Sequence, residues 1–146
     1  MSKRLAVLTA AKALIAEACP DADVIGFDGT DAAAQRIPPG GRIILGAGDL
    51  GDAEITLSPL TYFYDHGIPV EVLALDEMMI DALLLAIGTA IDADRTLGGL
   101  CDWLDVTAAG TEDIASYDER GNLIARPDRG GSFMIMASYS TPNPLG

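Results

Sequence analysis

The chain has 146 residues, with 22 acidic side chains, 9 basic side chains and one histidine, for a formal net charge of −13. This length suits a single domain, and the 49% of apolar residues excludes an intrinsically disordered tail. The acidic excess argues against a domain that grips nucleic acid or docks on an anionic membrane, because both need clustered Lys and Arg.

The first segment, residues 1–19, imitates a secretory signal. Lys12 interrupts its apolar run early, and Glu17 stands where a signal cleavage site needs a small residue. A packed amphipathic helix accounts for the segment better, because the apolar residues recur on one helical face and Pro20 ends the pattern. That face consists of Val7, Leu8, Ala11, Leu14, Ile15 and Ala18.

Short β-prone runs between turn signals fill the next part of the chain. Strands are expected at residues 23–27 and Arg42–Leu45, with a polar connector at 28–35 and a glycine-rich loop at 46–52. The run 54–65, which Pro59 breaks, is expected to pair with 68–75 as a hairpin. His66 and Gly67 then form the turn of that hairpin.

A second amphipathic helix is predicted after Asp76, which is a suitable N-cap. We expect it to end near Leu97, because Gly98 and Gly99 follow. Asp81 and Asp92 lie off its apolar stripe, toward solvent. The stripe consists of Ile80, Leu83, Leu84, Ile87 and Ile91.

Three further β segments complete the predicted order of elements. A strand is expected at 101–108, a hairpin at 112–125 and a final strand at 132–139. In the final strand Phe133 and its alternate neighbours share one side, with Met134 and Met136 on the other, so both faces are expected to be covered.

This order predicts the fold class. Adjacent strands are joined by turns rather than helices, which favours an α+β fold over a doubly wound one. We therefore expect a single domain over residues 1–146, with a mostly antiparallel (mixed) sheet packed with two main helices. The apolar stretch 82–91 is shorter than the roughly 20 residues of a membrane span, so we expect a protein kept in the cytoplasm or assembled there. Cys19 and Cys101 are expected to be reduced, buried thiols.

Two features are weighed as candidate chemistry. Residues 46–51 match the dinucleotide fingerprint G-x-G-x-x-G, but β-prone, acidic residues and Pro59 follow where that chemistry requires a helix. A plain loop is therefore favoured over a nucleotide site. His66 follows Asp65, but adjacent strand residues point to opposite faces, which favours a surface turn histidine over an oriented general base.

No cofactor or metal is expected. Four spaced aspartate pairs lack the full pattern of a calcium loop, which favours solvated carboxylates: Asp21/Asp23, Asp28/Asp31, Asp92/Asp94 and Asp102/Asp105. Arg120, Arg126 and Arg129 gather a third of the basic charge into one Gly/Asp-rich stretch, interleaved with acids. This pattern predicts a flexible loop suited to a partner surface.

The segment 91–103 is the most distinctive part of the sequence. It closes the second helix with D-R-T-L-G-G-L over residues 94–100 and passes directly into a strand. Together with the final strand, which ends in Tyr139-Ser140-Thr141-Pro142, it resembles the tail terminator family of long-tailed phages, the family of the lambda minor tail protein U. Relatives of that family also occur in phage-derived gene transfer agents. The resemblance covers residues 1–20 and 68–142 in the order of elements.

The resemblance implies a structural virion protein with no catalytic activity. It implies a hexameric ring on the head-proximal end of the tail tube, which stops tube polymerisation and presents a surface to the head-closure and neck proteins. The location implied is the tail or neck of a virion or phage-like particle, assembled in the host cytoplasm. The acidic charge fits a ring through which DNA passes without specific binding, because carboxylates repel phosphates.

The residues of the junction have two possible roles within this resemblance. Arg95, Thr96, Leu97, Gly98 and Gly99 match the helix-to-strand junction of the family. A structural role is favoured, in which the glycines allow a tight exit and Leu97 fills the core. The alternative is a subunit interface through Arg95, a cation at a helix C-terminus.

Two other functions stay open. A head-closure or head–tail joining protein is the alternative within the same class. A small cytosolic enzyme or nucleotide-binding module, using the loop 46–51 and His66, is the alternative from another class.

Overall fold

The computed structural model describes residues 1–27, 37–114, 120–121 and 128–146. Within them, two helices and seven strands form one α+β domain with a mixed, mostly antiparallel sheet. The predicted fold class is confirmed. The helices are α1 (Lys3–Ala18) and α2 (Glu77–Ala93). The strands are β1 (Asp23–Ile25), β2 (Arg42–Leu45), β3 (Glu54–Leu57), β4 (Leu60–Ala74), β5 (Trp103–Val106), β6 (Gly110–Ile114) and β7 (Asp128–Thr141).

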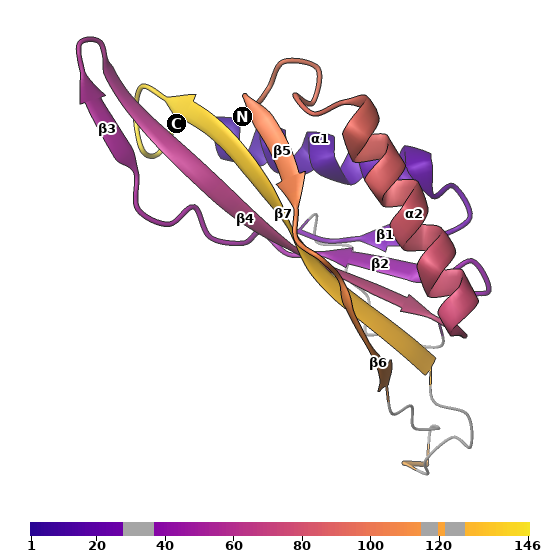
Figure 1. Ribbon diagram of the computed structural model, residues 1–146. Coiled ribbons are helices and arrows are strands. Elements are labelled where there is room, and N and C mark those ends of the chain that lie inside the picture. Colours follow the sequence, from indigo (N-terminus) through magenta and orange to yellow (C-terminus); the bar gives the residue numbers. More distant parts are fainter. Residues whose placement is uncertain (28–36, 115–119, 122–127) are drawn as a thin grey trace.

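Two long antiparallel strands, β4 and β7, form the axis of the molecule (Figure 1). Their register runs from Tyr62 opposite Thr141 to Ala74 opposite Arg129. Strands β3 and β2 pair with successive parts of the edge of β4 that faces away from β7. Strands β5 and β6 pair with the edge of β7 that faces away from β4. Among the strands of the described residues, β1 and β2 alone pair in parallel. The sheet is therefore built around one long ribbon.

Both helices pack on one face of this sheet, and they contact each other (Figure 1). Ser2 caps α1, because its hydroxyl oxygen accepts a hydrogen bond from the Leu5 N–H at 3.2 Å. Asp76 caps α2 as predicted, with its carboxylate 2.8 Å from the Met79 N–H. The predicted apolar faces of both helices pack against the core, with Leu14, Ala18, Leu83 and Leu84 only partly buried. The buried core includes Val7, Leu8, Ala11, Ile15, Ile80, Ile87, Ile91, Ile68, Val70, Val72, Leu104 and Ile135.

The predicted hairpin turn at His66 and Gly67 is wrong. Both residues lie in the middle of β4, which runs unbroken from Leu60 to Ala74. The turn is instead made by Ser58 and Pro59, between the paired residues Leu57 and Leu60. A Cβ at Gly67 would lie 2.6 Å from Met134 Cε on β7, which is the end of a flexible side chain that can move aside.

Other predicted boundaries shift as well. Helix α2 ends at Ala93 rather than near Leu97, because Asp94 leaves helical geometry with φ −146. The predicted cover on both faces of the final strand is not observed among the described residues, since both helices lie on the side of Phe133 and Ile135 and Met134 is 37% exposed on the other side. The hairpin predicted at 112–125 lies largely outside the described residues, and β6 pairs with the start of β7.

Candidate interaction surfaces

The junction after α2 is a tight, left-handed turn. Leu97, Gly98 and Gly99 have φ values of 49, 67 and 96. A Cβ at either glycine would meet no atom within 4 Å, so the positive φ, not a lack of space, makes glycine the suitable residue. The Asp94 carboxylate accepts a hydrogen bond from the Gly98 N–H at 3.0 Å, and the Leu97 side chain is buried. The exposed Thr96 contributes its carbonyl, which accepts from the Gly99 N–H at 3.0 Å.

Arg95 fastens this turn to β5. Its guanidinium donates to the Leu104 carbonyl at 2.9 Å, pairs with Asp92 and lies 3.5 Å from the Asp105 carboxylate. The same group stacks 5.0 Å from the centroid of the Trp103 ring. In addition, the Leu104 N–H donates to the Arg95 carbonyl at 2.7 Å. This geometry favours the structural role over the interface role for Arg95, because the guanidinium is occupied within its own chain.

The predicted arginine loop is wrong for Arg129. That residue belongs to β7, and its guanidinium pairs with Glu77, in the first turn of α2, at 2.8 Å. It also donates to the Thr111 hydroxyl on β6 at 3.2 Å, so it ties a helix to two strands. Arg120 is exposed, and Arg126 lies outside the described residues.

His66 is a buried core residue, not the predicted surface residue. Its side chain is 0% exposed, and both ring nitrogens have partners: Nδ1 lies 3.0 Å from the Tyr139 hydroxyl and Nε2 lies 2.6 Å from the Ala47 carbonyl oxygen. Burial lowers the pKa of His66, and the hydrogen bond to Ala47 opposes part of that effect. Asp65 points to the other face, as expected, and accepts from the Ser138 hydroxyl at 2.7 Å.

The glycine-rich loop 46–51, which connects β2 to β3, is hydrogen-bonded to β4. The Asp49 N–H donates to the Gly67 carbonyl at 3.2 Å, and the Gly67 N–H donates to the Asp49 carbonyl at 3.0 Å. Gly48 has φ +70, and a Cβ there would lie 1.9 Å from the Gly67 carbonyl oxygen. The strand β3 follows the loop, where a dinucleotide site needs a helix N-terminus. The loop therefore pairs with the edge of β4 and forms part of the sheet rather than a nucleotide site.

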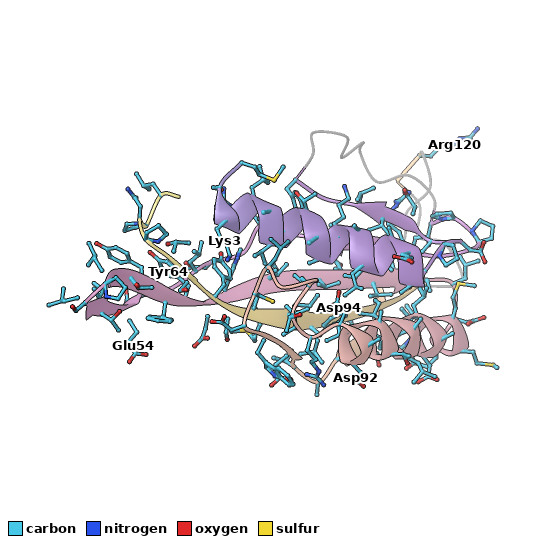
Figure 2. The ribbon with its side chains drawn as sticks, turned by 90° about the horizontal axis from the view of Figure 1, so that it is seen from above. Lys3, Glu54, Tyr64, Asp92, Asp94 and Arg120 are labelled. Atoms are coloured by element: carbon cyan, nitrogen blue, oxygen red, sulfur yellow. The ribbon has the colours of Figure 1, made fainter. Side chains whose placement is uncertain are left out.

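The hairpin of β3 and β4 carries the surface that sequence reasoning missed. It projects beyond α1 and α2 at one end of the molecule (Figures 1 and 2). Ile55, Leu57, Leu60 and Phe63 are 53%, 82%, 47% and 40% exposed. The alternation of apolar residues around Pro59 is visible in the sequence, but periodicity alone does not reveal that neither α1 nor α2 reaches this part of the sheet.

A second surface is a shallow, mostly apolar groove on the face of the sheet opposite the helices. Ile44, Pro69 and Met134 line it, and Glu71 stands at its edge. Gly46 lies beside Pro69 so closely that a Cβ would come 2.8 Å from Pro69 Cγ. This face therefore presents apolar side chains beside the acidic residue.

Cys19 and Cys101 are both free and buried, as predicted. Burial raises the pKa of each thiol, which disfavours the reactive thiolate. Among the described residues, no group of three or more His, Cys, Asp or Glu is arranged to hold a metal ion. None of the helices in the described part of the chain is long and apolar enough to cross a membrane. No model of a known protein family matches the sequence, and no curated protein matches it.

Proposed function

We propose that this chain is a ring-forming tail terminator of a long-tailed phage or phage-like particle. In this role it caps the head-proximal end of the tail tube and joins it to the head-closure and neck proteins. It acts as a structural component of the virion, assembled in the host cytoplasm, and it catalyses no reaction.

The projecting hairpin carries this proposal. Large apolar side chains grouped on an exposed projection are typical of surfaces that bind other proteins. Leu57, which is 82% exposed at the end of β3, gains nothing for the fold of a monomer in that position. Assembly accounts for such a surface more directly than catalysis does.

The junction supports the same proposal through its resemblance to the terminator family. Arg95–Gly99 form one folded connection between α2 and β5, held by the contacts of Arg95 and the left-handed turn at Leu97. Their structural role is compatible with a family motif that fixes the helix-to-strand geometry of each subunit.

The enzyme and nucleotide-binding alternatives lose the two features on which they depended. His66 has both ring nitrogens engaged in the core, so it is not placed to abstract a proton from a substrate. Gly48 packs against the β4 backbone, and strand β3 rather than a helix follows the loop. The loop therefore offers a phosphate no helix N-terminus.

The net charge of −13 bears on what passes through the proposed ring. Carboxylates on the inner wall repel the phosphate backbone, so that DNA can slide without sticking. We expect acidic side chains to be enriched on that wall, and basic ones to be rare there.

The assembly state tests this function. The purified protein, alone and mixed with tail tubes, should give rings of about six subunits by electron microscopy and light scattering. Loss of the protein from a producing cell should give overlong tubes or tailless heads. A strict monomer that also fails to cap tube ends would contradict the proposal. Tails of normal length that fail to join heads would point instead to a head-closure or joining protein.

A further inference from the structure

The side of the hairpin that shares the sheet face of the helices is an exposed apolar shelf. We use "shelf" for Ile55, Leu57, Leu60 and Tyr62. Tyr62 and Leu60 alternate with the buried Tyr64 along β4, and register places Ile55 opposite Tyr62 and Leu57 opposite Leu60. The shelf therefore continues the sheet face on which α1 and α2 pack, at a point that neither helix reaches (Figure 1).

The rim of the shelf is basic. Helix α1 begins with Lys3 and Arg4, and the Lys3 N–H donates to the Gly146 carbonyl at 3.5 Å, shortly after the end of β7 that pairs with Tyr62 and Tyr64. Tyr139 pairs with Tyr64 at the base of the hairpin. Burial raises the pKa of Tyr139 to about 12, and the guanidinium of Arg4 opposes part of that rise, so Arg4 lies near this base as well. Arg4 is exposed to solvent.

The outer face of α2 has the opposite character. Met78 and Leu85 are 84% and 69% exposed, and they lie seven residues apart on the side opposite the buried stripe. Asp81 lies on the same exposed side, as does Asp92, whose carboxylate pairs with Arg95 just after the helix, and α2 itself contains no Lys or Arg. This face is an apolar ridge flanked by acids.

We propose that the shelf of one copy of this chain receives the outer face of α2 of a second copy. Helix-on-sheet packing already covers the rest of the same sheet face, and Leu57 and Leu60 offer Met78 and Leu85 the same kind of apolar support. The basic rim meets the acidic flank, which opposes the repulsion between two acidic chains.

The two surfaces lie on different parts of the subunit, so the contact is heterologous. Repeated heterologous contacts form a closed ring when the rotation from one subunit to the next brings the last subunit back to the first. This inference deepens the proposed function, on which it rests, by naming the subunit interface of the ring.

Cysteine cross-linking tests the contact directly. A chain carrying both Leu57→Cys and Leu85→Cys should form, under mild oxidation, a ladder of covalent oligomers that ends at the ring size. Each single variant alone should form no ladder, while a mixture of the two single variants should give dimers that contain one of each. The native Cys19 and Cys101 are buried and do not compete. Assembled rings without the ladder would overturn the contact.

A charge exchange provides a second test. Arg4→Glu or Asp81→Arg should each weaken association by about tenfold or more, and the double variant should recover most of that loss. Glu17→Lys, an exposed charge reversal elsewhere on α1, is the matched control and should leave association unchanged. Equal loss in the control, or no recovery in the double variant, would count against the contact.

The outcomes separate this inference from the proposed function. If the wild-type protein forms rings and the Leu57 and Arg4 variants form the same rings, another surface makes the interface and the terminator proposal stands. If the wild-type protein stays monomeric with and without tail tubes, both fail.

Discussion

The Nδ1 atom of His66 lies 3.0 Å from the hydroxyl oxygen of Tyr139, on the paired strands β4 and β7. The Ala47 carbonyl oxygen, 2.6 Å from Nε2, can only accept a hydrogen bond, so Nε2 carries the proton. The neutral ring then accepts at Nδ1 from the Tyr139 hydroxyl. This chain of hydrogen bonds connects the long ribbon to the loop 46–51.

The buried imidazole makes stability depend on pH. The folded-state pKa of His66 lies below its ordinary value of 6.5, so the unfolded chain binds the proton more readily. The contribution of His66 is therefore fully present above about pH 6.5 and is lost as the pH falls toward the folded pKa. Urea unfolding between pH 5.5 and 8 should show this decline in the wild type and a smaller one in His66→Gln.

The comparison must be made as a difference between the two proteins, because the many carboxylates titrate in both. At pH 8, His66→Gln should also cost about 1–3 kcal/mol of stability, since it disturbs two buried hydrogen bonds. Tyr139→Phe is the control, because it removes one of those hydrogen bonds and keeps the titrating ring. Identical pH slopes in the wild type and His66→Gln would contradict the prediction.

Most of the fold could be predicted from the sequence, since the periodic apolar faces around Ile15 and Ile87 and the cap at Asp76 are local signals. The place of His66 could not, because its burial depends on Tyr139, 73 positions away. A histidine followed by glycine suggests a turn, and only the pairing of His66 with Ala137 and of Gly67 with Met136 on β7 shows that both continue a strand.

For the candidate surfaces too, local features could be predicted and features that depend on distant residues could not. The junction at Leu97–Gly99 was predictable, because the glycines and the leucine form a local pattern. The composition around Arg129 predicts a loop, whereas its backbone pairs with Ala74 on β4 and its guanidinium with Glu77, both distant in sequence. The exposure of Leu57 depends on where the helices end on the sheet, which no local pattern shows.

Replacement of Arg95 tests whether it acts as a structural clamp. Arg95→Ala should lower the free energy of unfolding by about 1–3 kcal/mol, because the Leu104 carbonyl and the ion pair with Asp92 lose their partner. Arg95→Lys should recover little, since an ammonium group cannot both reach this carbonyl and stack on Trp103. Chemical denaturation measures both.

Asp105→Asn is the matched control for the clamp. The Asp105 carboxylate is 68% exposed and 3.5 Å from the guanidinium, so its loss should change stability by no more than about 0.5 kcal/mol. If Arg95→Ala kept full stability and abolished assembly, the interface role would replace the structural one.

The two thiols should be protected in the folded protein. Burial raises the pKa of Cys19 and Cys101, and neither side chain is more than 5% exposed, so an aromatic disulfide reagent should react slowly at pH 8. In denaturant both thiols should react with the reagent at the rate of a free thiol. Rapid modification of the folded protein would show that one of these sites opens.

Glycine at position 48 is required by the close approach of two backbones. Gly48→Ala should cost several kcal/mol, because the new Cβ would lie 1.9 Å from the Gly67 carbonyl oxygen and would separate the loop 46–51 from β4. Gly51→Ala is the matched control. Its φ of +66 is equally left-handed, but no atom lies within 4 Å of the new Cβ, so only the conformational cost of about 1 kcal/mol applies. Thermal unfolding of both variants separates the two effects, and similar losses would show that contact with Gly67 does not set the requirement. A nucleotide that stabilised the wild type but not Gly51→Ala would return the loop to the dinucleotide interpretation.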